Sequence, residues 1–162
     1  MDLNRCCKTG SKKCGLALFF FTLVGAAPLL WGCQRPDPGA GGLVLRQDVA
    51  QALADAEASQ QSVLLFFHAP WCSACGALTK TLADPKVLKT LRRAQTMVVQ
   101  VEVGTDLAAR VPLPPALMPQ ALGVSGLPTL VYLSGPPWAP SGARLSGYVG
   151  PQRLIEWLKS AR

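Results

Sequence analysis

Residues 62–75 read SVLLFFHAPWCSAC, an apolar run followed closely by two cysteines with two residues between them. The continuous apolar stretch 63–67 predicts a buried central strand. The segment 72–83 has the pattern of a helix, so Cys72 and Cys75 are expected where a strand passes into a helix. Three roles are open for such a pair: a disulfide staple, a metal clip or a redox catalyst.

Helices and strands alternate along the rest of the chain. Asp48 and Asp84 stand where helix N-caps are expected, and Pro85 suits the first position of a helix. The pattern predicts helices at 48–60, 84–91 and 151–160, strands at 96–103, 129–133 and 143–149, a mixture of loop and short helix at 106–123, and a loop at 135–142. This order predicts an α/β fold with a central mixed sheet of four to five strands flanked by helices.

The first 33 residues have the pattern of an export signal. Basic residues precede the uncharged, largely apolar run 14–33, which ends in Leu-Trp-Gly-Cys. This ending resembles a bacterial lipoprotein signal in which Cys33 becomes the lipidated first residue, although Trp31 stands where a small residue is usual. The alternative is an uncleaved anchor, because the run is just long enough to span a bilayer. Both interpretations place the folded part outside the cytoplasmic membrane, in the periplasm or its equivalent.

The sequence thus predicts a signal or anchor at 1–33, a Pro/Gly linker at 34–44 and one domain at 45–162. The chain has a formal net charge of +7, of which +3 falls in residues 1–33. Basic runs with interleaved aromatic residues are missing after residue 33, so we expect no nucleic-acid partner.

The six cysteines also divide at the end of the signal. Three lie within it, Cys6, Cys7 and Cys14, and Cys33 ends it. If Cys33 carries lipid, only the close pair at 72 and 75 remains. A single close pair in an exported domain indicates something other than a scaffold of several disulfides.

The position of the pair suits redox chemistry. Cys72 is expected at a helix N-terminus, where unpaired N–H groups and the helix dipole favour a thiolate, and Cys75 follows one turn later. Trp71 would be an apolar platform beside the exposed sulfur. Pro128 directly precedes the apolar run TLVYL, and a cis bond that holds a loop against the cysteines is one reason for a proline there.

Residues 45–160 resemble the thioredoxin-fold thiol:disulfide oxidoreductases, and in particular the C-terminal periplasmic domain of the thiol:disulfide interchange protein DsbD. The segments that carry the resemblance are FFHAPWCSACGAL, DPKVLKTL, LGVSGLPTLVYL and GARLSGYVGPQRLIEWL. The resemblance implies that Cys72 is the nucleophile, Cys75 the resolving thiol, Trp71 an active-site neighbour and Pro128 a cis-proline. It implies no cofactor, and as partners it implies exported thiol or disulfide proteins and an electron donor in the membrane.

The chain departs from the family where a proton acceptor is usual. Phe66 stands at the position of a buried aspartate, Gly76 at that of a lysine, and Thr79 at that of a glutamate of the DsbD domain. We hypothesise that His68 or Glu102 assists the resolving thiol instead. The competing interpretation is a histidine satisfied in the core and a solvent-facing glutamate.

Other functions remain open at this point. Cys72, Cys75 and His68 are possible ligands of Cu(I) or zinc, as in a copper chaperone, although closed zinc sites need four ligands. A purely structural staple is a poor explanation, because closing so short a loop stabilises little. Within the same fold, a dithiol oxidase or isomerase is the alternative to a reductase.

Overall fold

A mixed five-stranded sheet forms the centre of the protein in the computed structural model, which describes residues 43–136 and 138–162. The strand order is β1-β3-β2-β4-β5, in which β1, β3 and β2 run parallel, β4 is antiparallel to β2, and β5 is antiparallel to β4. The strands are β1 (Leu45–Arg46), β2 (Ser62–His68), β3 (Thr96–Glu102), β4 (Thr129–Ser134) and β5 (Ala139–Ser146). The predicted α/β fold with a mixed sheet is therefore confirmed.

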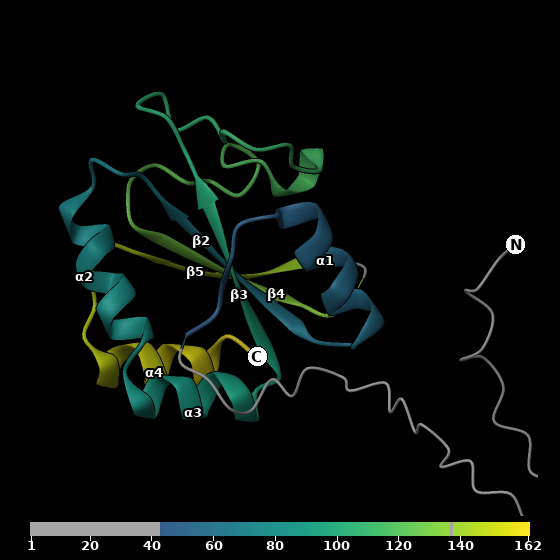
Figure 1. Cartoon of the computed structure of the whole chain (residues 1–162), viewed down its shortest axis with the longest axis vertical. Coiled ribbons are helices and arrows are strands. Elements are labelled where there is room, and N and C mark those ends of the chain that lie inside the picture. Colours follow the sequence, from purple (N-terminus) through teal and green to yellow (C-terminus); the bar gives the residue numbers. More distant parts are fainter. Residues whose placement is uncertain (1–42, 137) are drawn as a thin grey trace, which may run out of the picture. The chain divides into compact units, whose positions relative to one another are not determined.

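Helices cover both faces of the sheet (Figure 1). One face carries α1 (Val49–Ala58), and the other carries α2 (Ser73–Leu82), α3 (Pro85–Arg93) and α4 (Pro151–Ser160). Strand β2 is buried on both faces, because its successive side chains point to opposite sides and helices cover each side. Its odd-numbered residues 63–67 join the core cluster beneath α1, and Leu64 and Phe66 join the cluster beneath the other three helices.

Helices α1 and α3 begin at the capping residues that the sequence predicted. The Asp48 carboxylate accepts a hydrogen bond from the Gln51 N–H at 3.0 Å and caps α1. The Asp84 carboxylate accepts one from the Lys86 N–H at 2.8 Å, and Pro85 occupies the first position of α3. Each such cap typically contributes about 1 kcal/mol.

The structure differs from the prediction at the two edge strands. The segment 135–142 was predicted as a loop, but β5 already begins at Ala139. This strand lies at the sheet edge. Its register on β4 shifts between Val131 and Leu133, and Gly142 within it has a φ of +76°. Prolines and glycines are tolerated at edge strands and bulges, so the loop signal was misleading there. The two-residue strand β1 was not predicted either.

A long segment between β3 and β4 crosses the edge of the sheet at which β2 and β3 end (green, top of Figure 1). It contains the short 3-10 helix η1 (Pro115–Leu117), and buries Leu117, Leu122 and Val124 in the α1-side cluster. The Arg144 guanidinium on β5 donates hydrogen bonds to the carbonyl oxygens of Leu122 and Gly123, at 2.9 and 2.7 Å. The segment is thus fixed to the sheet just before it reaches residues 126–129.

The predicted signal or anchor at 1–33 and most of the predicted linker lie outside the described residues. Among the helices of residues 43–136 and 138–162, none is both long and apolar enough to cross a membrane.

Candidate active site

Cys72 and Cys75 are joined by a disulfide at the beginning of α2, with their Cα atoms 5.3 Å apart. The Cys72 N–H donates to the Ala69 carbonyl at 3.1 Å, which turns the chain from β2 into the helix. Cys72 is the N-cap, and its Sγ accepts a hydrogen bond from the Cys75 N–H at 3.1 Å. Cys72 is partly exposed, whereas Cys75 is 3% exposed. Of the two sulfurs, the one on Cys72 is therefore the one within reach of a partner.

Cys72 occupies the N-cap of α2, a position that favours an anion. Free N–H groups of the first turn carry partial positive charge, which favours an anion at the N-cap and lowers the pKa of a thiol placed there. The Cys75 carbonyl accepts a hydrogen bond from the Thr79 hydroxyl at 3.0 Å, one turn further along α2. This arrangement suits attack by Cys72 and resolution by Cys75.

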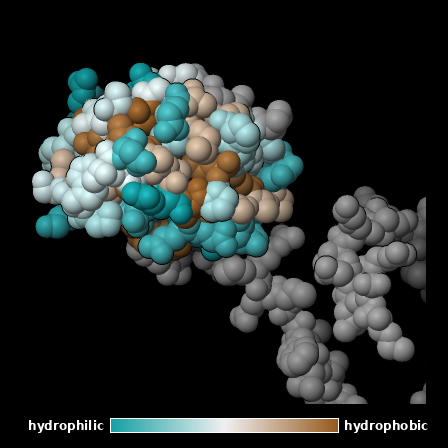
Figure 2. Space-filling view, turned by 90° about the horizontal axis from the view of Figure 1, so that it is seen from above, coloured by the Kyte–Doolittle hydropathy of each residue, from teal (hydrophilic) through white to brown (hydrophobic). Residues whose placement is uncertain are grey.

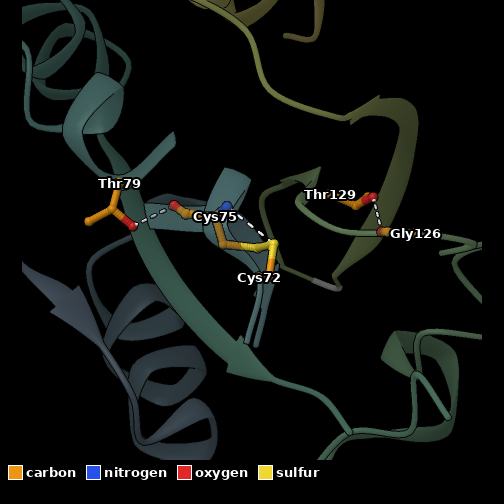
Figure 3. Close-up of a disulfide and its surroundings, with 5 residues drawn as sticks. All are labelled: Cys72, Cys75, Thr79, Gly126 and Thr129. Carbon is orange, nitrogen blue, oxygen red and sulfur yellow. Dashed lines mark hydrogen bonds between the residues drawn. A yellow bond between two sulfur atoms is a disulfide. The ribbon is translucent and has the colours of Figure 1, made fainter. Parts of the chain in front are cut away.

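The segment around Pro128 faces the disulfide (Figure 3). The Leu127–Pro128 peptide bond is cis, and Leu127 packs against the same hydrophobic cluster as Cys72. The fully buried Thr129 donates from its hydroxyl to the Gly126 carbonyl at 2.8 Å. The Pro128 carbonyl in turn accepts a hydrogen bond from the Gly147 N–H at 2.8 Å.

Thr129 also makes a hydrogen bond of 3.2 Å with the Ser146 hydroxyl on β5. Sequence reasoning singled out Pro128 but missed Thr129. The signal was a polar residue at the start of an otherwise apolar, buried strand, which must find a partner for its hydroxyl.

Two exposed aromatic residues adjoin, along the chain, residues of this site. Trp71 directly precedes Cys72 and is 58% exposed, and Tyr148 directly follows the Gly147 that bonds to Pro128 and is 55% exposed. Only Val44 among the other large hydrophobic residues described is comparably exposed. Sequence reasoning singled out Trp71 but not Tyr148, because a lone tyrosine after a strand carries no pattern of its own.

His68 and Glu102 are neighbours at the ends of β2 and β3. They pair directly in the parallel register of the two strands. The His68 ring lies 5.5 Å from the Phe66 ring, centroid to centroid. Burial lowers the pKa of His68 below its usual 6.5, and the charge of Glu102 opposes this by raising it. His68 is partly buried and Glu102 is exposed.

A metal site finds little support in the part of the chain that the structure describes. No group of three or more His, Cys, Asp or Glu side chains there is placed to hold a metal ion.

Known proteins share this fold. The thioredoxin-like family model matches residues 44–134. The thiol:disulfide interchange protein DsbD of Vibrio vulnificus is 32% identical over 114 residues, which are 70% of this chain and 18% of that protein. The chain thus spans less than a fifth of the length of that curated relative.

Solved structures agree on the architecture. A thioredoxin from Thermus thermophilus aligns with a TM-score of 0.57 at 28% identity, over 74% of this chain and 87% of that one. The oxidised DsbD C-terminal domain of Neisseria meningitidis aligns with a TM-score of 0.52 at 24% identity, over 74% of this chain and all of that one. The chain belongs to the thioredoxin-like family.

Proposed function

We propose that the protein is an exported, membrane-tethered oxidoreductase that reduces, or relays electrons to, the disulfides of other exported proteins. The observation that carries this proposal is the unequal placement of the two cysteines. Cys72 caps α2 and is partly exposed, whereas Cys75 is buried one turn further on. Two-step exchange requires a nucleophile that a substrate can reach and a resolving thiol held behind it.

In the reductive direction the Cys72 thiolate attacks one sulfur of the substrate disulfide. A sulfur–sulfur bond forms between protein and substrate, and the other substrate sulfur leaves as a thiolate. Cys75 then loses its proton and attacks Cys72, which forms the Cys72–Cys75 disulfide and releases the second substrate thiolate. Two electrons pass to the substrate, and its two thiolates take up the two protons that the cysteines lost.

The surface around the cysteines supports a protein substrate. Trp71 directly precedes Cys72, Tyr148 directly follows the Gly147 that bonds to Pro128, and both aromatic side chains are exposed. Aromatic residues are enriched where proteins bind one another. Figure 2 looks onto the edge of the sheet at which β2 and β3 end, and shows hydrophobic patches among hydrophilic side chains. An extended polypeptide is a suitable ligand for such a mixed surface.

Exchange of thiols and disulfides is supported by the matched relatives, which are named thiol:disulfide interchange proteins, and the reductive direction is our proposal. A reductase must be reduced again after each turnover, and we propose that an electron donor in the membrane does this. Tethering through lipidated Cys33, or through an uncleaved segment within 1–33, would keep the domain near that donor.

The reduction potential of the Cys72–Cys75 couple tests the direction. The full chain, with Cys6, Cys7, Cys14 and Cys33 replaced by serine, is equilibrated against defined thiol/disulfide buffers. A potential at or below about −200 mV is expected for a reductant of this fold, and a potential near about −120 mV would indicate a dithiol oxidase instead. A reduced chain that binds copper stoichiometrically and reduces no disulfide would indicate a copper chaperone.

Fractionation tests the tether. The wild-type chain is expected with the membranes, and Cys33→Ser separates the two kinds of anchor. Release of this variant into the soluble fraction supports a lipid on Cys33, and retention supports an uncleaved segment. A wild-type chain recovered in the soluble fraction would contradict tethering altogether.

A further inference from the structure

The resolving step of the proposed exchange needs an acceptor for the proton of Cys75. A thiolate, not a thiol, attacks a disulfide, and an ordinary thiol has a pKa of about 8.5. Cys75 is 3% exposed, so bulk water has little access to it. Phe66, fully buried in the same cluster, has no proton-accepting group. The acceptor must therefore come from elsewhere on this face of the sheet.

Cys75 of α2 packs in the same buried cluster as Leu64 and Phe66 of β2. Helix α2 runs back across the face that carries Leu64 and Phe66. Cys75 lies about 4.5 Å along the helix axis from Cys72, because a helix rises about 1.5 Å per residue. Cys75 and Phe66 belong to the same buried cluster, and His68 follows Phe66 by two residues, or about 6.6 Å of strand, on this face.

His68 points to this same face of the sheet. Side chains alternate along a strand, so His68 shares its face with Phe66, and the two rings lie 5.5 Å apart. Glu102 is the direct partner of His68 in the parallel register, which places both side chains on one face. The strands are separated by about 4.8 Å, which brings the carboxylate and the imidazole within interaction range.

Few other titratable groups face His68. From β3 the facing group is Glu102, and α2 contributes Cys75 to the cluster on this face. Lys80 of α2 lies five residues beyond Cys75, towards the far end of the helix. The connecting residues 69–71 and the first residues of β4 carry no charge. Tyr132 of β4 is buried in the same cluster but pairs with Leu64, four residues before His68. Asp106 and Arg110 lie in the segment after β3, where the Arg110 N–H donates to the Glu102 carbonyl. His68 and Glu102 are thus the two bases paired at the ends of β2 and β3.

We propose that His68 accepts the proton of Cys75 in the resolving step, and that Glu102 acts as a positioning residue by stabilising the imidazolium. This inference rests on the proposed function. Because burial lowers the pKa of His68, the imidazole is neutral and free to accept a proton near pH 7. The histidine is partly exposed, so it passes the proton on to solvent or to the departing substrate thiolate.

A two-phase reaction separates the steps. The reduced full chain, with the four N-terminal cysteines replaced by serine, is mixed with dithiobis-nitrobenzoate in a stopped-flow instrument. The first phase releases one thionitrobenzoate as Cys72 attacks, and the second releases another as Cys75 resolves the mixed disulfide. Rates of both phases are measured from roughly pH 5 to 9, across the ordinary pKa values of histidine and cysteine.

His68→Phe keeps a ring of similar size against Phe66 but removes the base. We expect the second phase at pH 7 to slow about tenfold or more, since a positioned base contributes typically about 10²–10⁴-fold. The wild-type rate should level off above the lowered pKa of His68, whereas the variant rate should keep rising towards a thiol's own pKa of about 8.5. The first phase should change less than about twofold, and imidazole added to His68→Ala should restore part of the second.

Glu102→Gln tests the positioning role of Glu102. Removing the carboxylate lowers the pKa of His68 further, so the rise of the second phase should move to lower pH and its plateau should fall a few-fold. Glu156→Gln, an equal charge change on exposed α4, is the matched control and should behave as wild type. Second-phase rates and pH profiles that are unchanged in His68→Phe would overturn the role of His68 alone. Wild-type protein that releases no second thionitrobenzoate has no resolving step, and the proposed function would fall with it.

Discussion

Thr129 offers a sharp test of how the Pro128 segment is held against the cysteines. Its hydroxyl is buried at the start of β4 and bonds to the Gly126 carbonyl at 2.8 Å and to the Ser146 hydroxyl at 3.2 Å. Thr129→Val keeps the branched shape, which suits a strand, and removes both hydrogen bonds. The variant therefore separates the contribution of the hydroxyl from that of packing.

The magnitude follows from the two lost bonds. Each hydrogen bond contributes a net of about 0.5–1.5 kcal/mol, and a carbonyl left unpaired in the interior costs more than one that reaches water. Gly126 is only half-buried and Ser146 is exposed, so both can recruit water. Two bonds together contribute about 1–3 kcal/mol, and we expect the free energy of unfolding to fall by about 1–2 kcal/mol, in the lower part of this range.

Urea titration measures this loss. Thr129→Ser keeps the hydroxyl and is expected to retain the bond to Gly126, at the cost of one buried methyl group. Thr90→Val is the matched control, because its hydroxyl bonds only to the Lys86 carbonyl of its own helix, far along the chain from residues 126–129. It should change the unfolding free energy by less than about 0.5 kcal/mol.

A kinetic measurement completes the test. We expect a protein substrate to lie along the Pro128 segment, so loss of that segment's fixed position should slow reduction of a protein disulfide more than the reaction with a small disulfide. Wild-type stability in Thr129→Val, together with an unchanged rate for a protein disulfide, would refute the reasoning.

Three further predictions concern the core, the crossing segment and pH. Leu78→Ala, at a fully buried position of α2, should cost about 2–5 kcal/mol in denaturant titration; a loss under 1 kcal/mol would contradict tight packing beneath that helix. Gly123→Ala should destabilise the fold by about 1 kcal/mol or more, because the glycine has a φ of +64° and an added Cβ would lie 2.3 Å from the Arg144 guanidinium; an unchanged melting temperature would speak against it. His68 has a pKa that is lower in the folded state than in the unfolded chain, so the unfolded chain binds the proton more tightly. Stability should therefore fall as pH drops below about 6.5 and be constant above it, and His68→Phe should remove this part of the pH dependence.

The sequence predicted those features that depend on neighbouring residues. Asp48 and Asp84 cap their helices because the signal and its partner lie within three residues. The buried strand β2 was predicted from its continuous apolar run. The disulfide between Cys72 and Cys75 and the cis bond before Pro128 are both present in the structure. Their catalytic roles remain predictions.

Features that depend on distant pairing were not accessible in this way. The bonds of Thr129 depend on β5 lying beside β4, which no local pattern specifies. Likewise, His68 and Glu102 were singled out separately, but their direct pairing follows only from the register of β2 on β3. Strand β5 was placed four residues late because its glycines and prolines look like a loop until its position at the sheet edge is known.

The position of the base has a physical consequence for the whole site. A carboxylate at residue 66 would have to be desolvated, since that residue is fully buried, and an unpaired charge there costs several kcal/mol. Phe66 removes this cost and adds apolar area to the cluster beneath α2. On our proposal the acid–base function lies two residues further along β2, at His68, which is partly exposed on the same face. There the imidazole contacts the core on one side and solvent on the other, so the proton has a way out without any internal relay.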